Sequence, residues 1–136
     1  MVGLIWLIQL VHYPLFNRVG SDSFQQYHHG HSMLITPIVG IAMVIELVSS
    51  MILILQPLKG NSLGVPIFGF ILVIIIWAST AFLQVPYHQS LSQVFDPHSV
   101  NMLVMTNWIR TIAWSFRGFI TLYILFKFLE CITNPT

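Results

Sequence analysis

The sequence predicts an all-α fold, an integral membrane bundle of four transmembrane helices that run up-down-up-down. Composition is the first observation: the 136 residues are 56% hydrophobic and 7% charged, with a mean hydropathy of +0.82. A soluble domain carries about 25% charged residues, so this chain could not cover a water-facing surface. Pattern is the second, because long apolar stretches alternate with polar, turn-rich connectors and no period-two alternation indicates strands.

Each predicted helix follows from one apolar stretch. A helix needs about 20 mostly apolar residues to cross a bilayer core. The helices are expected at about 2–18, 32–55, 64–85 and 102–129, within a single transmembrane domain that spans 1–136. The first is slightly short, and it is expected to be retained because no basic leader or small-residue cleavage site accompanies it. Pro37 is expected in the first turns of the second helix, where proline is tolerated.

The connectivity places all the histidines at one end of the bundle. An up-and-down path brings the first and third connectors, residues 17–31 and 86–100, to the same membrane face, which we call the histidine end. The N-terminus, the turn around Lys59 and the C-terminus are expected at the opposite end. All six histidines of the chain lie at or near the histidine end: His12, His28, His29, His31, His88 and His98.

Charge and composition also predict location and partners. Lys59 and Lys127 belong to the opposite end, so the positive-inside rule places that end in the cytoplasm and the histidine end in the periplasm of a bacterial inner membrane. The expected partners are the lipid bilayer and either other membrane subunits or further copies of this chain. The net charge of +1 offers no basic patch for nucleic acid. Cys131, the single cysteine, excludes an internal disulfide.

Four of the histidines are candidate metal ligands: His12, His28, His31 and His88. Histidine is the commonest metal ligand, and metal sites in bundles draw ligands from several helices. His28 and His31 share a face if the second helix begins early, and His29 then points away. No H-E-x-x-H motif or cysteine pair is present. Three hypotheses therefore stay open: a metal ion or haem site, a neutral cluster that handles protons or hydrogen-bonds a substrate, and structural histidines.

Ionisable residues inside membrane spans are expensive, so each is a functional candidate. Glu46 and Arg117 lie at similar depths in the second and fourth helices, which predicts an ion pair. Arg110 and Arg117 share one face of the fourth helix with Asn107 and Trp114, at spacings of three and four. The candidate catalytic residues are Glu46, Arg110 and Arg117.

Further polar residues recur beside the histidines. Gln9 lies three positions before His12, and Gln84 lies four positions before His88. The candidate cofactor-binding residues are Gln9, Gln84, Asn107 and Trp108. Which cofactor they would hold is not fixed by the sequence, beyond the metal ion or haem already considered.

Several motifs together resemble a known family. They are "W-x-x-Q-x-x-HYP-x-F", "YH-x-x-HS", "LQVPYHQSL-x-x-x-F" and "TNWIRTIAWSFRG", which between them span almost the whole chain. The set is similar to a family of small bacterial four-helix membrane proteins of unknown function. Its closing block is also similar to that of anthrone-oxygenase-like membrane proteins, mainly through Asn107, Trp108 and Arg110. This resemblance implies a pocket for a flat aromatic or quinone-like substrate.

Two functions from different classes follow as expectations. The first is a small membrane redox enzyme, of oxygenase or oxidoreductase type, that acts on a lipophilic aromatic or quinone-like compound. The second is a non-catalytic accessory subunit of a larger membrane complex, whose polar residues serve assembly.

Overall fold

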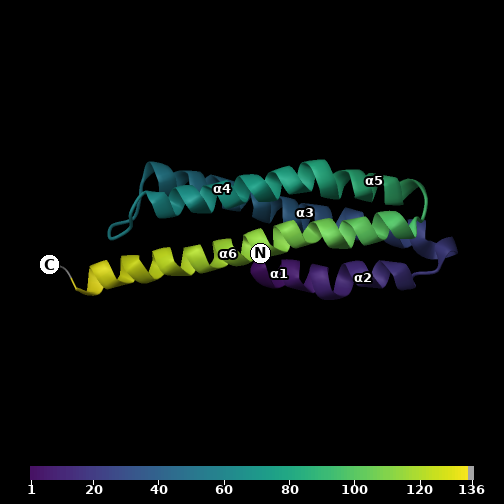
Figure 1. Cartoon of the computed structure of the whole chain (residues 1–136), viewed down its shortest axis with the longest axis horizontal. Coiled ribbons are helices and arrows are strands. Elements are labelled where there is room, and N and C mark those ends of the chain that lie inside the picture. Colours follow the sequence, from purple (N-terminus) through teal and green to yellow (C-terminus); the bar gives the residue numbers. More distant parts are fainter. Residues whose placement is uncertain (135–136) are drawn as a thin grey trace.

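The computed structural model describes residues 1–134, and helices joined by short connections make up this part of the chain, without a strand. The first helical segment contains α1 (Val2–Leu7), η1 (Ile8–His12), α2 (Tyr13–Leu15) and η2 (Phe16–Arg18). The next helix is α3 (Ser21–Leu55). After it, α4 (Gly64–Ser79), η3 (Thr80–Gln84) and α5 (Val85–Gln93) form one continuous helical rod, which we call the α4–α5 rod. The last helix is α6 (Pro97–Thr133). All of them lie along one long axis (Figure 1).

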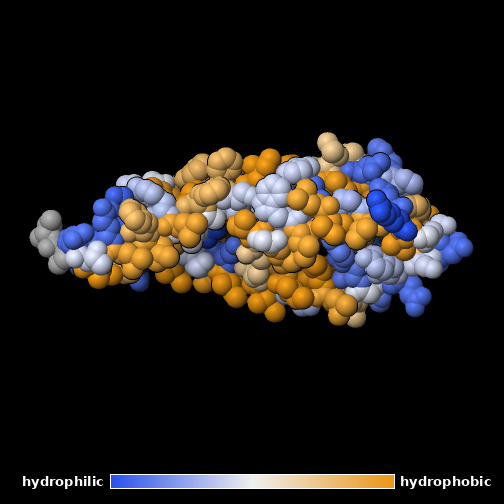
Figure 2. All heavy atoms as spheres, turned by 90° about the horizontal axis from the view of Figure 1, so that it is seen from below, coloured by the Kyte–Doolittle hydropathy of each residue, from blue (hydrophilic) through white to orange (hydrophobic). Residues whose placement is uncertain are grey.

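Three of these helices are long and apolar enough to cross a membrane: α3, the α4–α5 rod and α6. Their outward faces carry large apolar side chains, such as Leu34 at 73% exposed and Phe82 at 78% exposed. Figure 2 shows apolar side chains over the middle of the molecule and polar ones gathered toward its two ends. Exposed apolar surface on this scale suits contact with lipid.

The helices extend further than the apolar stretches that predict them. α3 begins at Ser21 rather than at residue 32, α5 ends at Gln93 rather than at 85, and α6 runs from Pro97 to Thr133 rather than from 102 to 129. The reason is that hydropathy reports the part of a helix in lipid, whereas polar turns continue the same helix into water. Pro37 consequently lies deep inside α3, and its expected place in the first turns is wrong.

The first helical segment covers only part of the length of α6. Its N-terminus lies near the middle of the molecule (Figure 1), and Val2 packs beside Gly118, whereas α6 continues to Thr133. Met1 therefore does not reach the opposite end of the bundle, as the up-and-down path had led us to expect. At the histidine end the segment packs along α6, and its side chains His12 and Phe16 contact His31 and Phe24 of α3.

Two short π-helical turns interrupt otherwise α-helical segments, and each is explained by a proline. Pro14 follows η1 and Pro86 follows η3. A proline inside a helix lacks the N–H for the carbonyl four residues earlier and clashes with it. Those carbonyls belong to Leu10 and Phe82, which lie within the two π turns. Widened turns of this kind are frequent at functional sites, and both turns here carry polar side chains inward.

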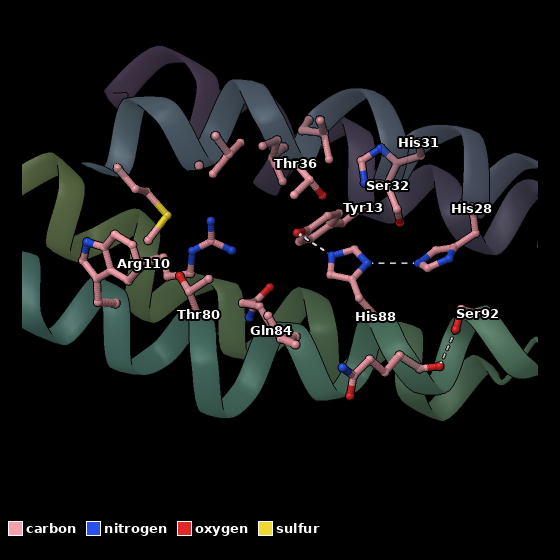
Figure 3. A pocket seen from close by; sticks show the side chains of 18 residues that line it. Tyr13, His28, His31, Ser32, Thr36, Thr80, Gln84, His88, Ser92 and Arg110 are labelled. Carbon is pink, nitrogen blue, oxygen red and sulfur yellow. Dashed lines mark hydrogen bonds between the residues drawn. The ribbon is translucent and has the colours of Figure 1, made fainter. Parts of the chain in front are cut away.

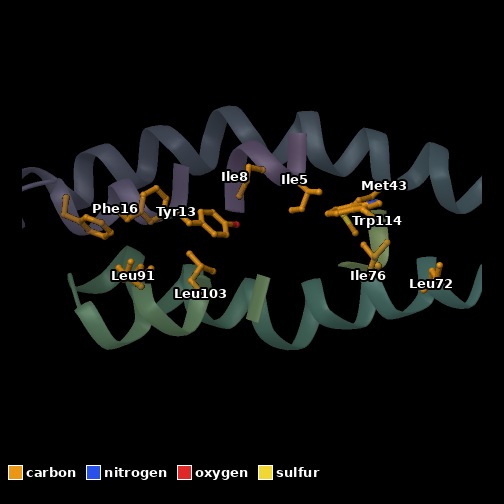
Figure 4. Packing of buried hydrophobic residues seen from close by; sticks show 13 residues of the cluster. Ile5, Ile8, Tyr13, Phe16, Met43, Leu72, Ile76, Leu91, Leu103 and Trp114 are labelled. Carbon is orange, nitrogen blue, oxygen red and sulfur yellow. The ribbon is translucent and has the colours of Figure 1, made fainter. Parts of the chain in front are cut away.

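One cluster of buried hydrophobic side chains joins the first segment, α3, the α4–α5 rod and α6. Phe16 of the first segment lies over Leu91 of α5, and Ile5 of the same segment lies near Trp114 of α6 (Figure 4). Phe24 of α3 joins them, its ring centroid 5.9 Å from that of Phe16. This packing fixes the relative positions of the helices that carry the polar residues described below.

The start of α6 is fixed by a capping carboxylate. Asp96 accepts hydrogen bonds from the Ser99 hydroxyl at 2.6 Å, the Ser99 N–H at 2.9 Å and the His98 N–H at 3.1 Å. Pro97 occupies the first helical position, where its missing N–H costs nothing. The Ser99 hydrogen bonds, with those of His98, hold the pKa of Asp96 below its ordinary value of 3.8.

This cap predicts an acid-sensitive contribution to stability. Because the pKa of Asp96 is lower in the folded state, its contribution is complete above the unfolded pKa and is lost as pH falls through the folded pKa. Asp96→Asn keeps an oxygen that caps but does not titrate. We expect the thermal midpoint in detergent, followed by circular dichroism, to fall less in D96N than in the parent protein between about pH 6 and about pH 3. Equal losses in both proteins would contradict the assignment.

Candidate functional site

Four of the six histidines meet at the histidine end. His12 of η1 and His31 of α3 are joined from Nε2 to Nδ1 at 2.7 Å. His28 of α3 and His88 of α5 are joined from Nε2 to Nδ1 at 3.0 Å. The rings of His31 and His88 stack with centroids 5.8 Å apart, so the two pairs touch. We call these four residues the histidine cluster.

The register of α3 decides which histidines take part. Because α3 begins at Ser21, His28 and His31 lie three residues apart on its inner face, and His28 is only 1% exposed. His29 lies on the outer face and is exposed, as expected for an early helix start. His98, in the first turn of α6, is exposed and stays outside the cluster.

Tyr13 extends the histidine cluster toward the interior. Its phenol is 4% exposed and its hydroxyl lies 3.1 Å from Nε2 of His88. Figure 3 shows Tyr13, His88 and His28 connected in a row. A bond between two imidazoles needs one nitrogen with a proton and one without, so at most one ring of each pair is charged. A row of groups that both donate and accept can pass a proton along its length.

The geometry of the cluster is that of a hydrogen-bonded network. Within residues 1–134, no group of three or more His, Cys, Asp or Glu side chains is placed to hold a metal ion. Two cluster nitrogens, Nδ1 of His28 and Nε2 of His31, are buried without a hydrogen-bond partner in the same part of the chain. The ligand set of His12, His28, His31 and His88 for a metal ion or haem stays a prediction.

A pocket of about 510 Å³ opens beside the cluster, between α3 and the α4–α5 rod. Cavities of about 300–1,000 Å³ hold small-molecule ligands. Most of its wall is apolar and comes from Ile8, Ile35, Val39, Met43, Trp77 and Val85. The polar side chains that face it are Tyr13, His28, His31, Gln84, His88 and Arg110, together with Ser32, Thr36, Thr80, Gln89 and Ser92.

Arg110 reaches this pocket from α6. It is 4% exposed, and its guanidinium carbon lies 5.0 Å from the ring centroid of Trp114, a cation–π contact. Figure 3 shows its guanidinium between the two walls of the pocket. No carboxylate among residues 1–134 pairs with it, since the ion pair found there is Lys127–Glu130 at the surface. Its Nε has no hydrogen-bond partner in the described chain.

The expected ion pair between Glu46 and Arg117 is wrong. The Glu46 carboxylate accepts instead from the indole N–H of Trp114 at 2.6 Å. Arg117 donates to two backbone carbonyls, those of Gly69 at 3.3 Å and Glu46 at 3.5 Å. Gly69 permits this approach, because a Cβ there would lie 3.2 Å from the guanidinium. Neither Glu46 nor Arg117 lines the pocket beside the cluster; both border a second cavity at the start of α1.

Gln9 and Asn107 form a buried polar contact between the first segment and α6. The Asn107 amide donates to Oε1 of Gln9 at 2.8 Å, and the Thr111 hydroxyl donates to the same oxygen at 3.2 Å. The Gln9 amide donates to the Val104 carbonyl at 3.1 Å. Gln9 is 2% exposed and Asn107 is fully buried, and both lie outside the pocket wall. The contact holds two helices together.

Removing this contact is expected to destabilise the fold. Asn107→Ala leaves Oε1 of Gln9 short of one donor in a buried site, and leaving a buried polar group short of a partner costs about 1–3 kcal/mol. The measurement is the midpoint of unfolding in detergent with increasing denaturant. Asn101→Ala is the matched control on the same helix, because Asn101 is exposed. A midpoint for N107A equal to that of N101A would show that the contact contributes nothing.

The two remaining candidates occupy different places. Gln84 of η3 is 2% exposed and lines the pocket; its amide donates to the Thr106 hydroxyl at 2.9 Å. Trp108 packs edge-on against Trp6, with ring centroids 5.6 Å apart, and does not line the pocket. Of the four candidate cofactor-binding residues, Gln84 alone is part of the pocket wall.

Sequence reasoning assigned no site role to Tyr13 or Trp77, which both line the pocket. A signal for Tyr13 exists: it stands between His12 and Pro14, and the proline widens the preceding turn. "Q-x-x-HYP" and "LQVPYH" share a glutamine before the proline, and those two prolines follow the two π turns. Trp77 carries no comparable signal within an apolar run.

Comparison with family models, curated proteins and solved structures finds no match for this sequence.

Proposed function

We propose that this chain is a small integral membrane enzyme, a four-transmembrane-helix bundle that binds a lipophilic aromatic or quinone-like compound and oxidises it. The observation that carries the proposal is Arg110, a buried cation without a carboxylate partner in the described chain, in the wall of a mainly apolar pocket beside a histidine network. An apolar wall suits a hydrocarbon body, and a few convergent polar groups fix its orientation. The resemblance to anthrone-oxygenase-like proteins supports the same class.

The proposed chemistry uses the residues in separate roles. Arg110 stabilises an oxygen of the compound that becomes negatively charged, an electrostatic role for which a preorganised donor is effective. The row Tyr13–His88–His28 takes up the proton that this oxygen loses. The oxidant is dioxygen. For a quinol, two electrons and two protons leave the substrate, and dioxygen takes up both to give the quinone and hydrogen peroxide.

The test is an assay of dioxygen uptake with 2-methyl-1,4-naphthoquinol, compared with the spontaneous rate. We expect the purified protein to accelerate uptake and Arg110→Gln to remove the acceleration. Arg117→Gln is the matched control, because Arg117 is also a buried arginine of α6 but lies outside the pocket. An unaccelerated rate with the folded parent protein would contradict the proposal.

The same preparation tests the cofactor version of the proposal, in which the histidine cluster holds a metal ion or haem. A Soret band or a stoichiometric metal by elemental analysis would support it. A colourless, metal-free protein that still accelerates uptake would assign the chemistry to the histidine network alone.

The alternative is an accessory subunit of a larger membrane complex. It is favoured by the far half of α6, beyond the first segment, which exposes Phe119 at 71%, Leu122 at 64% and Phe126 at 63%. This strip could bind another membrane subunit or a second copy of the chain. Stoichiometric copurification of large partners, together with an unaccelerated dioxygen uptake, would favour the subunit function over the enzyme.

The proposed location is a bacterial inner membrane with the histidine end in the periplasm. Lys59 and Lys127 at the other end support this orientation through the positive-inside rule. Cys131, the single cysteine, lies at the Lys127 end of α6, so labelling of its thiol shows which side of the membrane that end faces. We expect a membrane-impermeant maleimide to label Cys131 in lysed cells and not in intact cells with a permeabilised outer membrane. Equal labelling would reverse the orientation.

A further inference from the structure

The polar atoms in the pocket wall describe the ligand that the pocket accepts. Two of them are buried N–H donors without an acceptor in residues 1–134: Nε of Arg110 and Nε1 of Trp77. A buried donor without a partner costs free energy, and each of these two borders the pocket. Ligand oxygens that accept hydrogen bonds would satisfy them.

The positive charge of Arg110 indicates that the ligand oxygen bound to it is negatively charged. A buried guanidinium remains protonated, and a buried charge is normally paired. Glu46 does not supply the negative charge that would pair with Arg110. Its carboxylate accepts a hydrogen bond from Trp114, and Glu46 is not part of the pocket wall. Trp114 stands between them, with Arg110 stacked on its ring and Glu46 on its N–H. An anionic ligand would complete this arrangement.

Gln84 specifies a second polar group. Its amide nitrogen is used by Thr106, whereas its Oε1 is buried with no donor among the described residues. Oε1 of Gln84 could accept a hydrogen bond from a hydroxyl group on the ligand. A simple alkyl carboxylate supplies acceptors and a charge but no donor, so it leaves Gln84 unsatisfied. Most of the remaining wall is apolar and includes the indole of Trp77.

We propose that the pocket binds an aromatic hydroxy compound as its monoanion, with the oxyanion on Arg110 and a remaining hydroxyl on Gln84. This inference rests on the proposed function, because it specifies the ionisation state and substrate class at the same site. A neutral quinone, lacking both the charge and the hydroxyl, binds more weakly than such an anion.

The probe is 2,7-dihydroxy-1,4-naphthoquinone, whose 2-hydroxyl is acidic and whose anion is distinguished by its visible absorption. The matched neutral compound is its 2-methyl ether, which keeps the 7-hydroxyl. Binding to the full chain in detergent micelles is followed by absorption, with empty micelles as the blank. We expect the anion to bind about 10- to 100-fold more tightly than the ether, the range for a hydrogen bond to a charged group. The apparent pKa of the probe should fall on binding.

Variants separate the roles of the residues. Arg110→Gln should remove the preference for the anion, whereas Arg117→Gln should keep it. Loss of binding in both variants would indicate a general loss of structure. Arg110→Lys keeps the charge and should retain part of the preference. Gln84→Leu should weaken binding of the dihydroxy probe more than binding of 2-hydroxy-1,4-naphthoquinone, which lacks the second hydroxyl.

The outcomes are distinguishable. If the ether binds as tightly as the anion, the ligand is not recognised as an oxyanion and this inference is wrong, while the pocket keeps its proposed lipophilic ligand. If decanoate binds as tightly as the dihydroxy probe, the site is a carboxylate site and the aromatic assignment falls. If the folded protein binds neither quinone, both this inference and the proposed function fail.

Discussion

Replacing His88 with phenylalanine is expected to lower the rate of dioxygen uptake by about 10²- to 10⁴-fold, the usual contribution of a positioned proton acceptor. His88 is the one residue bonded both to Tyr13, on the pocket side, and to His28. Phenylalanine keeps a planar ring in the core but neither accepts nor donates a proton. The measurement is initial uptake of dioxygen with 2-methyl-1,4-naphthoquinol, after subtraction of the spontaneous rate.

His29→Phe is the control for the His88 substitution. His29 neighbours His28 in sequence but lies on the outer face of α3 and is exposed. It should therefore keep the parent rate. Thermal midpoints of both variants, measured alongside, show whether the bundle is intact. A folded H88F protein with the parent rate would remove the histidine row from the mechanism.

Replacing Trp114 with alanine is expected to destabilise the bundle by about 3–5 kcal/mol, as for other buried tryptophans and phenylalanines. Trp114 is 1% exposed within the core. The substitution leaves a large cavity, frees the Glu46 carboxylate from its donor and takes away the ring on which Arg110 stacks. Unfolding in detergent with increasing denaturant gives the free energy of unfolding directly.

Two further substitutions separate packing from polar contacts at Trp114. Trp108→Ala is the matched control, because Trp108 is half-buried and packs edge-on against the exposed Trp6, and it should cost clearly less. Trp114→Phe keeps much of the volume and loses the N–H, so its effect should be intermediate. If W114A were no worse than W108A, Trp114 would not be the central packing residue that its burial indicates.

Hydropathy was sufficient to predict the helical, membrane-type character of the chain. It was insufficient for the ends of the helices, because the turns from Ser21 to His31 are polar but remain part of α3. The acidic Asp22 in the first turn suits the helix dipole, a local signal that a search for apolar stretches does not use. The early start of α3 is what turns His28 and His31 toward the interior.

The site was partly predictable for a similar reason. Topology alone placed the candidate ligands at one end, and the structure brings together the side chains of His12, His28, His31 and His88. Which imidazoles pair depends on how far each helix is rotated about its own axis. The two π turns, η1 and η3, change this rotation in the first segment and in the α4–α5 rod. Sequence could not supply that rotation.

The Glu46–Arg117 prediction illustrates the same limit. Counting residues along a helix gives the depth of a side chain, and the two residues do lie close enough for Arg117 to reach the Glu46 carbonyl. Depth does not say which neighbour a carboxylate meets. Trp114 offers an N–H at 2.6 Å, and Gly69 leaves room for the guanidinium to turn toward backbone oxygens.

Photolabelling with a naphthyl diazirine, followed by mapping of the labelled residues, tests whether a lipophilic aromatic compound binds in the pocket between α3 and the α4–α5 rod. Ile35, Val39 and Met43 face the pocket, whereas Leu34, Ile38 and Ile41 of the same helix are 61–73% exposed on the outer face. We predict labelling of the first set that is suppressed by excess 2,7-dihydroxy-1,4-naphthoquinone. Labelling confined to the outer set, and unchanged by the competitor, would contradict the claim.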